Sequence, residues 1–371
     1  MTAALSLGTY RVRAVSQAAR TALAAGSPWV DTAPNYAHGR AHEELRPLLR
    51  EYPTVRVATK AGFFTEEQGR TALADGVLTR EEAAGRHSLE RGFVRWQTER
   101  SLATLGRVDL VFVHNPEHDG QGLDRTVLHG RVREAFTALE EFARTGRIGG
   151  YGVATWSGLT SGAFSVPELL TLARQAAGSA EHHFTGLQMP VSLIMDVPIT
   201  QALNGGGPLV QAKDAGLITF GSAPLHGGAL LDAMTPELVN LIRPGLSAAA
   251  AALLAAGSCP GLDVVLASAS TREHWDDAAK ALAAPLTAQE LRRVTDELAS
   301  ESEGAGPDGG RPRPGGQGTG AYLHWAAGVG LPRCHPRTPS GGPMATGEPD
   351  GEEERGQETG GGHRRRLRAG A

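Results

Sequence analysis

Residues 108–114, VDLVFVH, and residues 262–269, LDVVLASA, are short runs that are almost continuously apolar. Strands with one wet face alternate apolar and polar residues, whereas parallel strands buried on both faces read as unbroken apolar runs. Similar runs recur along the chain, and a helical pattern follows each of them. We predict eight strands, at Leu5–Thr9, Trp29–Thr32, Val55–Lys60, Leu110–His114, Ile148–Thr155, Gly186–Ser192, Gly216–Ala223 and Asp263–Ala269.

The segments between these strands include amphipathic helices. We predict helices at Ala14–Ala25, Ser88–Leu105, Arg131–Thr145 and Ser247–Ala256. Eight strand-helix units in about 280 residues fit a closed barrel. The alternative is an open doubly wound sheet, which usually carries a GxGxxG turn after its first strand, and LGTYRVRA at residues 7–14 has no such turn. We therefore predict an α/β fold, a (β/α)₈ barrel over residues 1–303 with an extra helix at Leu286–Leu298.

The composition changes at Gly304. From there to the end, 19 of the 68 residues are Gly and 8 are Pro, and such a segment cannot bury a core. The basic run HRRRLRAGA at residues 363–371 shares this segment with the acidic stretch GEEERGQE at 351–358. We predict a disordered, low-complexity tail over residues 304–371 with no specific role in binding nucleic acid.

Charge and cysteine content narrow the classes of partner. The net charge of −4 provides no global basic field for nucleic acid or an anionic membrane, so we expect small-molecule partners. Cys259 and Cys334 fall on opposite sides of the composition change, and residues 1–15 contain no apolar stretch of signal-peptide length. The longest apolar run, Ala248–Ala256, is far shorter than the roughly 20 residues that span a bilayer. We expect a cytoplasmic protein, and the sequence leaves its oligomeric state open.

One connection is unusually long. Ala61–His87 separates the third predicted strand from the next helix, and in a barrel it overhangs the catalytic face. A substrate lid and a surface insertion without a catalytic role are both consistent with its composition.

Four reactive side chains fall where such a barrel places its chemistry, at the carboxyl ends of strands. Asp31, Lys60 and His114 end the second, third and fourth predicted strands, and Tyr36 follows Asp31 by five residues. Polar groups of this kind are rarely buried unless they are paired. Each alone is typical of a structural residue, but four at successive strand ends indicate a site.

Together these residues can handle a proton at a carbonyl group. A tyrosine hydroxyl has an ordinary pKa of about 10, and a nearby ammonium such as that of Lys60 lowers it by stabilising the phenolate. Asp31 would hold the ammonium, and His114 would donate a hydrogen bond to the substrate oxygen. Tyr36 would then protonate the substrate as it is reduced.

These residues belong to a co-linear set of motifs that resembles the aldo-keto reductase superfamily over roughly Leu5–Leu298. The motifs are VDTAPNYAHG at 30–39, VATKAG at 57–62, SLATLGRVDLVFVHNPE at 101–117, ALEEFARTGRIGGYGVATW at 138–156 and SAPLHGG at 222–228. The resemblance implies a reductase of an aldehyde, ketone or imine, and it places the family's catalytic tetrad on Asp31, Tyr36, Lys60 and His114.

The resemblance also implies NADPH as the cofactor, with NADH or no cofactor left open by the sequence. In the family a Ser-Asn pair and a Gln hold the nicotinamide amide, and the equivalents are Ala154, Thr155 and Gln188. An aromatic ring usually stacks on the nicotinamide, but this chain has Ser222 there.

The rest of the implied cofactor groove follows the seventh and eighth strands. The loop of Leu225, His226, Gly227 and Gly228 would wrap the diphosphate with backbone amides. Ala278 replaces an Asn that contacts the adenine nucleotide in the family. The remaining candidates for phosphate contacts are Ser268, Ser270, Thr271, Arg272 and His274.

Substrate contacts are predicted in the strand-end loops near the tetrad, where aromatic side chains would line an apolar pocket. The candidates are Tyr10, Phe63, Phe64, Asn115, Glu117 and Trp156. No zinc-binding spacing is present, so no metal is predicted.

Two other classes of function compete with a reductase. A redox-neutral lyase, dehydratase or isomerase would use the same acid-base site without hydride transfer, and the altered cofactor positions favour it. A non-catalytic binding barrel has no use for four costly polar groups at successive strand ends.

Overall fold

Eight parallel strands close into a barrel in the order β1 to β8, as predicted. The computed structural model describes residues 2–119, 124–269 and 271–304. The ends of each strand lie within two residues of the predicted run, apart from the start of β5, which is three residues later than predicted. The strands are β1 (Ala4–Gly8), β2 (Trp29–Asp31), β3 (Arg56–Ala61), β4 (Leu110–His114), β5 (Tyr151–Ala154), β6 (Phe184–Pro190), β7 (Ile218–Ser222) and β8 (Val264–Ala267).

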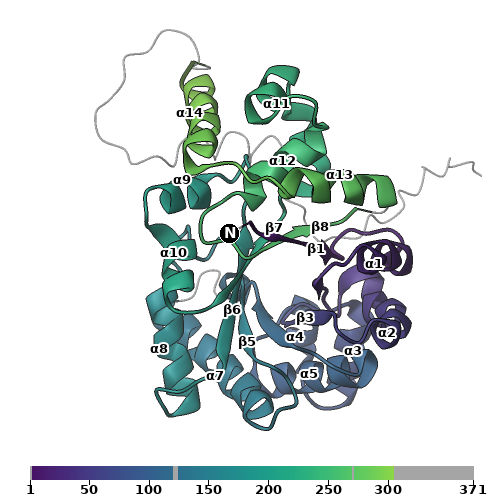
Figure 1. Ribbon diagram of the computed structural model, residues 1–371. Helices are drawn as coiled ribbons and strands as arrows, with labels where there is room; N and C mark the ends of the chain where they lie inside the picture. Colours follow the sequence, from purple (N-terminus) through teal and green to yellow (C-terminus); the bar gives the residue numbers. More distant parts are fainter. Residues whose placement is uncertain (1, 120–123, 270, 305–371) are drawn as a thin grey trace, which may run out of the picture. The chain divides into compact units, whose positions relative to one another are not determined.

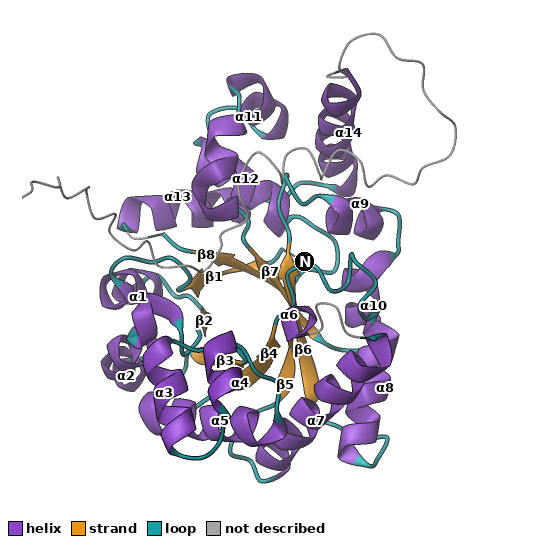
Figure 2. Ribbon diagram, turned by 180° about the vertical axis from the view of Figure 1, so that it is seen from behind, coloured by secondary structure: helices purple, strands orange, loops and turns teal. Residues whose placement is uncertain are grey.

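Helices surround this ring of strands (Figures 1 and 2). The helices are α1 (Val15–Ala24), α2 (Ala41–Glu51), α3 (Glu66–Ala74), α4 (Arg80–Gly85), α5 (Arg91–Leu105), α6 (Pro116–Asp119), α7 (Arg125–Arg144), α8 (Val166–Ala177), α9 (Val197–Leu203), α10 (Gly207–Asp214), α11 (Pro236–Ile242), α12 (Ala248–Gly257), α13 (Arg272–Leu282) and α14 (Ala288–Gly304), with 3₁₀ segments η1 (Tyr36–Gly39) and η2 (His226–Ala233).

The barrel closes because β1 pairs with β8 in parallel register, from Ala4 opposite Val264 to Leu7 opposite Ala267. Its interior is packed rather than hollow. The buried side chains inside it form one cluster of Trp29, Ala58, Leu110, Phe112, Ala154, Phe220, Val264 and Leu266.

Two further clusters lie between the strands and the helices. One consists mainly of residues 7–217 and includes Val111, Phe136 and Leu169. The other consists mainly of residues 189–294 and includes the Ala/Leu helix α12, whose residues 250–257 are all buried. The predicted helix at Ser247–Ala256 is confirmed as α12, and the two clusters divide the outer core between the first and second halves of the barrel.

The long connection after β3 is mostly helical. It contains α3 and α4, and a β-bridge between Phe63 and His87 joins its two ends. The Gln97 side chain accepts a hydrogen bond from the Gly62 amide at 2.8 Å and donates one to the Phe63 carbonyl at 2.9 Å. The segment between residues 61 and 87 is therefore pinned to α5 at its base, and its role as a lid stays a prediction.

The predicted extra helix is confirmed as α14. The predicted tail at 304–371 lies outside the described residues except for Gly304, which ends α14. Among the helices in the described ranges, none has both the length and the apolar character that crossing a membrane requires.

Backbone strain gathers on one face of the barrel. The non-glycine residues with positive φ all lie in segments that follow the carboxyl end of a strand. Within the described ranges they are Arg11, Ala37, His38, Arg86, Asn115, Ala223 and His226. Such strain costs free energy and concentrates at functional sites, so it marks this face as the one that carries the chemistry.

Candidate active site

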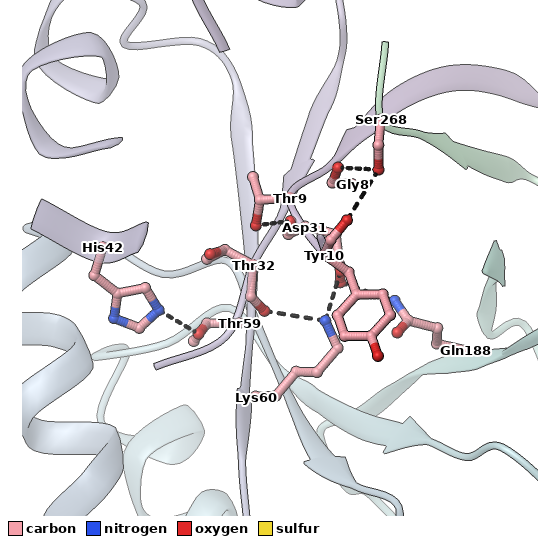
Figure 3. A network of polar contacts seen from close by, with 10 residues as sticks. All are labelled: Gly8, Thr9, Tyr10, Asp31, Thr32, His42, Thr59, Lys60, Gln188 and Ser268. Carbon is pink, nitrogen blue, oxygen red and sulfur yellow. Dashed lines mark hydrogen bonds and ion pairs between the residues drawn. The ribbon is translucent and has the colours of Figure 1, made fainter. Parts of the chain in front are cut away.

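A buried ion pair lies at the centre of this face. Lys60 Nζ is 2.5 Å from Asp31 Oδ1, and both side chains are less than 5% exposed. Figure 3 shows the ammonium held between this carboxylate and the Thr32 carbonyl oxygen, which lies 3.0 Å away. Strands β2 and β3 position the pair because Asp31 and Ala58 are partners in their parallel register, which places Lys60 two residues farther along β3.

The environment of Lys60 favours a labile proton. Burial lowers the pKa of the Lys60 ammonium, and the charge of Asp31 and its hydrogen bond to Lys60 partly oppose that shift. The second oxygen of Asp31 accepts a hydrogen bond from Gln188 Nε2 at 2.8 Å, which links β6 to the pair. Asp31 thus has a partner on each oxygen, and this offsets part of the cost of burying its charge.

Tyr36 lies over the ammonium. Lys60 Nζ is 5.0 Å from the centroid of the Tyr36 ring, within the range of a cation–π contact. Tyr36 begins η1, and the positive φ values of Ala37 and His38 turn the chain immediately after it. The ring is 9% exposed, so most of it is held within the protein.

His114 completes the predicted set at the end of β4. Its ring meets the Tyr36 ring edge-on, with centroids 6.1 Å apart. Burial, with the neighbouring charge of Lys60 and the imidazoles of His87 and His118, lowers the pKa of His114 well below its ordinary value. The imidazole is therefore neutral at pH 7, and within the described residues its buried Nδ1 makes no hydrogen bond.

Beyond His114, a row of aromatic rings packs against the site on the side away from Tyr36. Phe63 lies 5.0 Å from His114 and 4.4 Å from His87, centroid to centroid, and His118 lies 5.0 Å from Phe63. His87 Nε2 donates a hydrogen bond to the His114 carbonyl at 2.8 Å. Glycine is needed at position 62, where φ is +143° and a Cβ would come within 2.9 Å of His87.

Tyr10 extends the same row of rings in the other direction. Its centroid is 5.2 Å from that of Tyr36, and 46% of the residue is exposed. Asn115 lies beside the tetrad with a φ of +45°, and its amide donates to the Ala154 carbonyl at 2.6 Å. Phe64 points elsewhere, into a buried cluster with Phe93.

Thr155 and Trp156 are held by a carboxylate from the preceding unit. Glu117 Oε1 accepts hydrogen bonds from the Thr155 hydroxyl at 2.9 Å, the Trp156 amide at 2.7 Å and the Ser157 amide at 2.9 Å. Glu117 therefore anchors the loop after β5. The Trp156 ring then faces the ring of His226, with centroids 5.8 Å apart.

The remaining cofactor candidates lie along β7 and β8. Ser222 ends β7, and Leu225 and Gly227 lie in the loop that follows it. The Ser268 hydroxyl donates to the Gly8 carbonyl at 2.7 Å and to the Tyr10 carbonyl at 3.3 Å, so it joins β8 to the loop after β1.

The start of α13 holds the last candidates. Thr271 caps the helix by accepting a hydrogen bond from the His274 amide at 3.3 Å. Arg272 Nε donates to both carboxylate oxygens of Asp276, at 2.8 and 2.9 Å. Ser270 lies outside the described residues.

Sequence reasoning missed three contributors to this face. His87 and His118 come from the long connection and from α6, and their spacing from His114 forms no recognisable motif. Arg11 follows the first strand by three residues, and a basic residue in a strand-end loop was a usable signal. Within the described ranges, no three His, Cys, Asp or Glu side chains are grouped so as to hold a metal ion.

Comparison with known proteins identifies relatives of this barrel. Residues 3–170 match the model of the aldo/keto reductase family, and no curated protein matches the chain. An aldo-keto reductase from Klebsiella pneumoniae, solved in complex with NADPH, shares 19% identity and a TM-score of 0.54 over 80% of this chain and 90% of its own. A glycerol dehydrogenase from Gluconobacter oxydans shares 17% identity and a TM-score of 0.60 over 84% of this chain and 96% of its own. At these identities the structural likeness establishes the shared fold.

Proposed function

We propose, because the chain belongs to the aldo-keto reductase superfamily, that it is an NADPH-dependent reductase of a small aldehyde or ketone. The observation that carries the proposal is the buried Asp31–Lys60 pair beneath the Tyr36 ring, with the neutral imidazole of His114 at the ring's edge. A purely structural ion pair needs neither the tyrosine nor the histidine.

In this proposal Tyr36 gives its hydroxyl proton to the carbonyl oxygen of the substrate. The Lys60 ammonium stabilises the phenolate that remains, and Asp31 keeps the ammonium beneath the ring. His114 is neutral, so one ring nitrogen donates a hydrogen bond to the same oxygen without competing as a strong acid. Bulk solvent then returns a proton to Tyr36.

The residues present fit a dinucleotide. Bound NADPH would supply the hydride that reduces the carbonyl carbon. Gln188 and Thr155 would lie against its nicotinamide amide, although Asp31 and Glu117 already engage their side chains. The strained loop from Ala223 to Gly228 supports a diphosphate site. His226, Gly227 and Gly228 are consecutive residues with positive φ, and the two glycines have no side chain to keep a phosphate away from the backbone amides.

The row of rings favours a flat, apolar substrate. Tyr10 on one side and Phe63 with His118 on the other flank Tyr36 and His114. Aromatic faces and edges attract planar groups beyond the gain from buried area alone. We therefore place the substrate between Tyr10 and Phe63, with Asn115 and Trp156 at its margins.

One observation favours a redox-neutral enzyme instead. Ala154 and Ser222 lack the side chains that hold and stack a nicotinamide in the family, and both positions belong to the candidate groove. A lyase, dehydratase or isomerase would use the acid-base residues alone.

Cofactor binding and turnover separate the two functions. Fluorescence titration of the purified full chain with NADPH should give saturable binding, and NADPH absorbance should fall when benzaldehyde is added. Tyr36→Phe should lower kcat by about 10²–10⁴-fold with little change in NADPH affinity. Tyr52→Phe, at the other end of the barrel just before β3, serves as the matched control and should behave as wild type. Absence of NADPH binding, or full activity in Tyr36→Phe, would overturn the proposal.

A further inference from the structure

Two arginines lie near the candidate cofactor groove, and their surroundings differ. Arg272, the candidate from the sequence, makes a two-oxygen contact with Asp276 one turn along α13. Both side chains are more than half exposed, which is the usual arrangement of a surface helix pair. The positive charge of Arg272 is therefore already offset by a carboxylate.

Arg11 has no such partner. It is exposed in the loop after β1, and no hydrogen bond or ion pair joins it to a carboxylate in the ranges that the structure describes. Its guanidinium carbon lies 5.4 Å from the centroid of the Tyr10 ring. Its backbone is held at a φ of +58°, an unfavourable conformation for an arginine that must be maintained by the surrounding loop.

The guanidinium lies against the loop after β7. Arg11 Nη1 is 2.9 Å from the point that a Cβ on Gly227 would occupy. Gly227 also has a φ of +69°, so glycine suits this position both for its backbone and for the space that the guanidinium fills. The charge thus lies where a side chain at position 227 would have begun.

Arg11 also affects the pKa of its neighbour, His226. Burial, and then the positive charge of Arg11, lower the pKa of His226. The His226 imidazole is therefore neutral at pH 7 and adds no positive charge to this surface. The guanidinium of Arg11 therefore places a positive charge between the loops after β1 and β7.

We propose that Arg11, whose guanidinium fills the space beside Gly227, binds the diphosphate of the dinucleotide cofactor. A guanidinium presents a planar fork of donors that matches phosphate oxygens, and its charge persists at every physiological pH. The assignment rests on the proposed function, because it needs a dinucleotide in the groove. In this assignment the main cation that contacts the cofactor is Arg11, in the loop after β1, rather than Arg272 at the start of α13.

The test compares Arg11→Ala with Arg272→Ala in the full chain. NADPH dissociation constants come from fluorescence titration at low and high salt, and circular dichroism verifies that each variant is folded. Arg11→Ala should weaken NADPH binding about 10–100-fold and reduce its dependence on salt. Arg272→Ala should change the dissociation constant less than 3-fold, on the order expected for an exposed pair, and Arg11→Lys should recover part of the affinity.

A second measurement separates the diphosphate from an anionic substrate. KM is compared for benzaldehyde and 4-carboxybenzaldehyde at saturating NADPH. If Arg11→Ala raises KM only for the carboxylated aldehyde and leaves NADPH affinity intact, Arg11 binds substrate and the proposal is overturned. Equal NADPH affinity in wild type and Arg11→Ala overturns the role of Arg11 alone, whereas a wild-type protein that binds no NADPH overturns the proposed function.

Discussion

The two halves of the barrel face hold their polar side chains in different ways. On the side of β2 to β4, Asp31, Lys60 and His114 are almost fully buried, and each lies at the end of a strand. On the side of β7 and β8, the candidates other than Ser222 lie in loops or at a helix start, and Arg272 and Ser268 are exposed. The match to the family model ends at residue 170, within α8, so it covers the first side and not the second.

This difference indicates that proton transfer and cofactor binding place unequal demands on the chain. A buried ammonium needs a fixed carboxylate, because an unpaired charge in the interior costs several kcal/mol. Contacts to a dinucleotide at the surface can instead come from backbone or from any nearby cation. The Arg11 guanidinium, which lies beside Gly227, is such a cation.

The largest expected effect concerns the buried pair. Lys60→Met leaves Asp31 buried without its cation, and we expect the free energy of unfolding to fall by about 3–5 kcal/mol, together with loss of turnover. Lys213→Met removes a cation from its pair with Asp263, a more exposed pair at the other end of the barrel, and should cost less than about 1 kcal/mol. Urea denaturation of both variants checks the contrast, and equal losses would mean that burial does not distinguish the two pairs.

A smaller loss of stability is expected at Glu117, which joins the β4 side of the barrel face to the loop after β5. Glu117 follows β4 and accepts three hydrogen bonds from the loop after β5, so Glu117→Gln should lower the free energy of unfolding by about 1–3 kcal/mol. Because this loop carries Thr155, NADPH affinity should fall more than kcat. Glu134→Gln on the exposed face of α7 is the control. A variant that loses kcat but keeps its NADPH affinity would place Glu117 with the proton-transfer residues instead.

The smallest expected effect is a pH-dependent contribution to stability. Glu140 on α7 accepts hydrogen bonds from the His183 amide at 3.0 Å and from His183 Nδ1 at 2.5 Å, just before β6. Burial raises the pKa of Glu140, but these hydrogen bonds and the charge interaction with His183 outweigh it, so the folded pKa lies below its ordinary value.

A carboxyl group with a lowered folded pKa stabilises the fold above its unfolded pKa, about 4.3, and this contribution disappears as the pH falls through the folded pKa. Glu140→Gln should therefore lower Tm by about 2–4 °C at pH 7. The gap between variant and wild type should stay constant down to about pH 5 and narrow below about pH 4.3. A gap that widens on acidification would contradict the assigned role of Glu140.

Much of the fold could be predicted from the sequence. Short, nearly continuous apolar runs such as Leu110–His114 form buried strands, because a parallel strand covered on both faces is apolar along its length. The helices between residues 61 and 87 could not be predicted from the sequence. Both α3 and α4 are short and contain a glycine, Gly69 and Gly85, so their apolar periodicity is weak.

In the candidate site, too, some residues could be predicted from the sequence and others could not. Asp31, Tyr36, Lys60 and His114 could be named because each lies at or just after a strand end, where local sequence places its side chain on the catalytic face. The contacts of His87, Glu117 and Arg11 could not be predicted, and Glu117 was predicted only as a substrate contact, because each of these residues contacts a segment from another βα unit. His87 reaches His114, Glu117 reaches Thr155, and Arg11 lies beside a glycine 216 positions away along the chain.

The sequence by itself determined the barrel and the identity of its four strand-end residues, because apolar periodicity and strand order are local properties of the chain. Only the tertiary structure showed that Gln188 closes the Asp31–Lys60 pair and that the Arg11 guanidinium lies beside Gly227. Hydrogen bonds and ion pairs depend on distances of a few ångströms, and closing the barrel sets those distances between residues that are far apart in sequence.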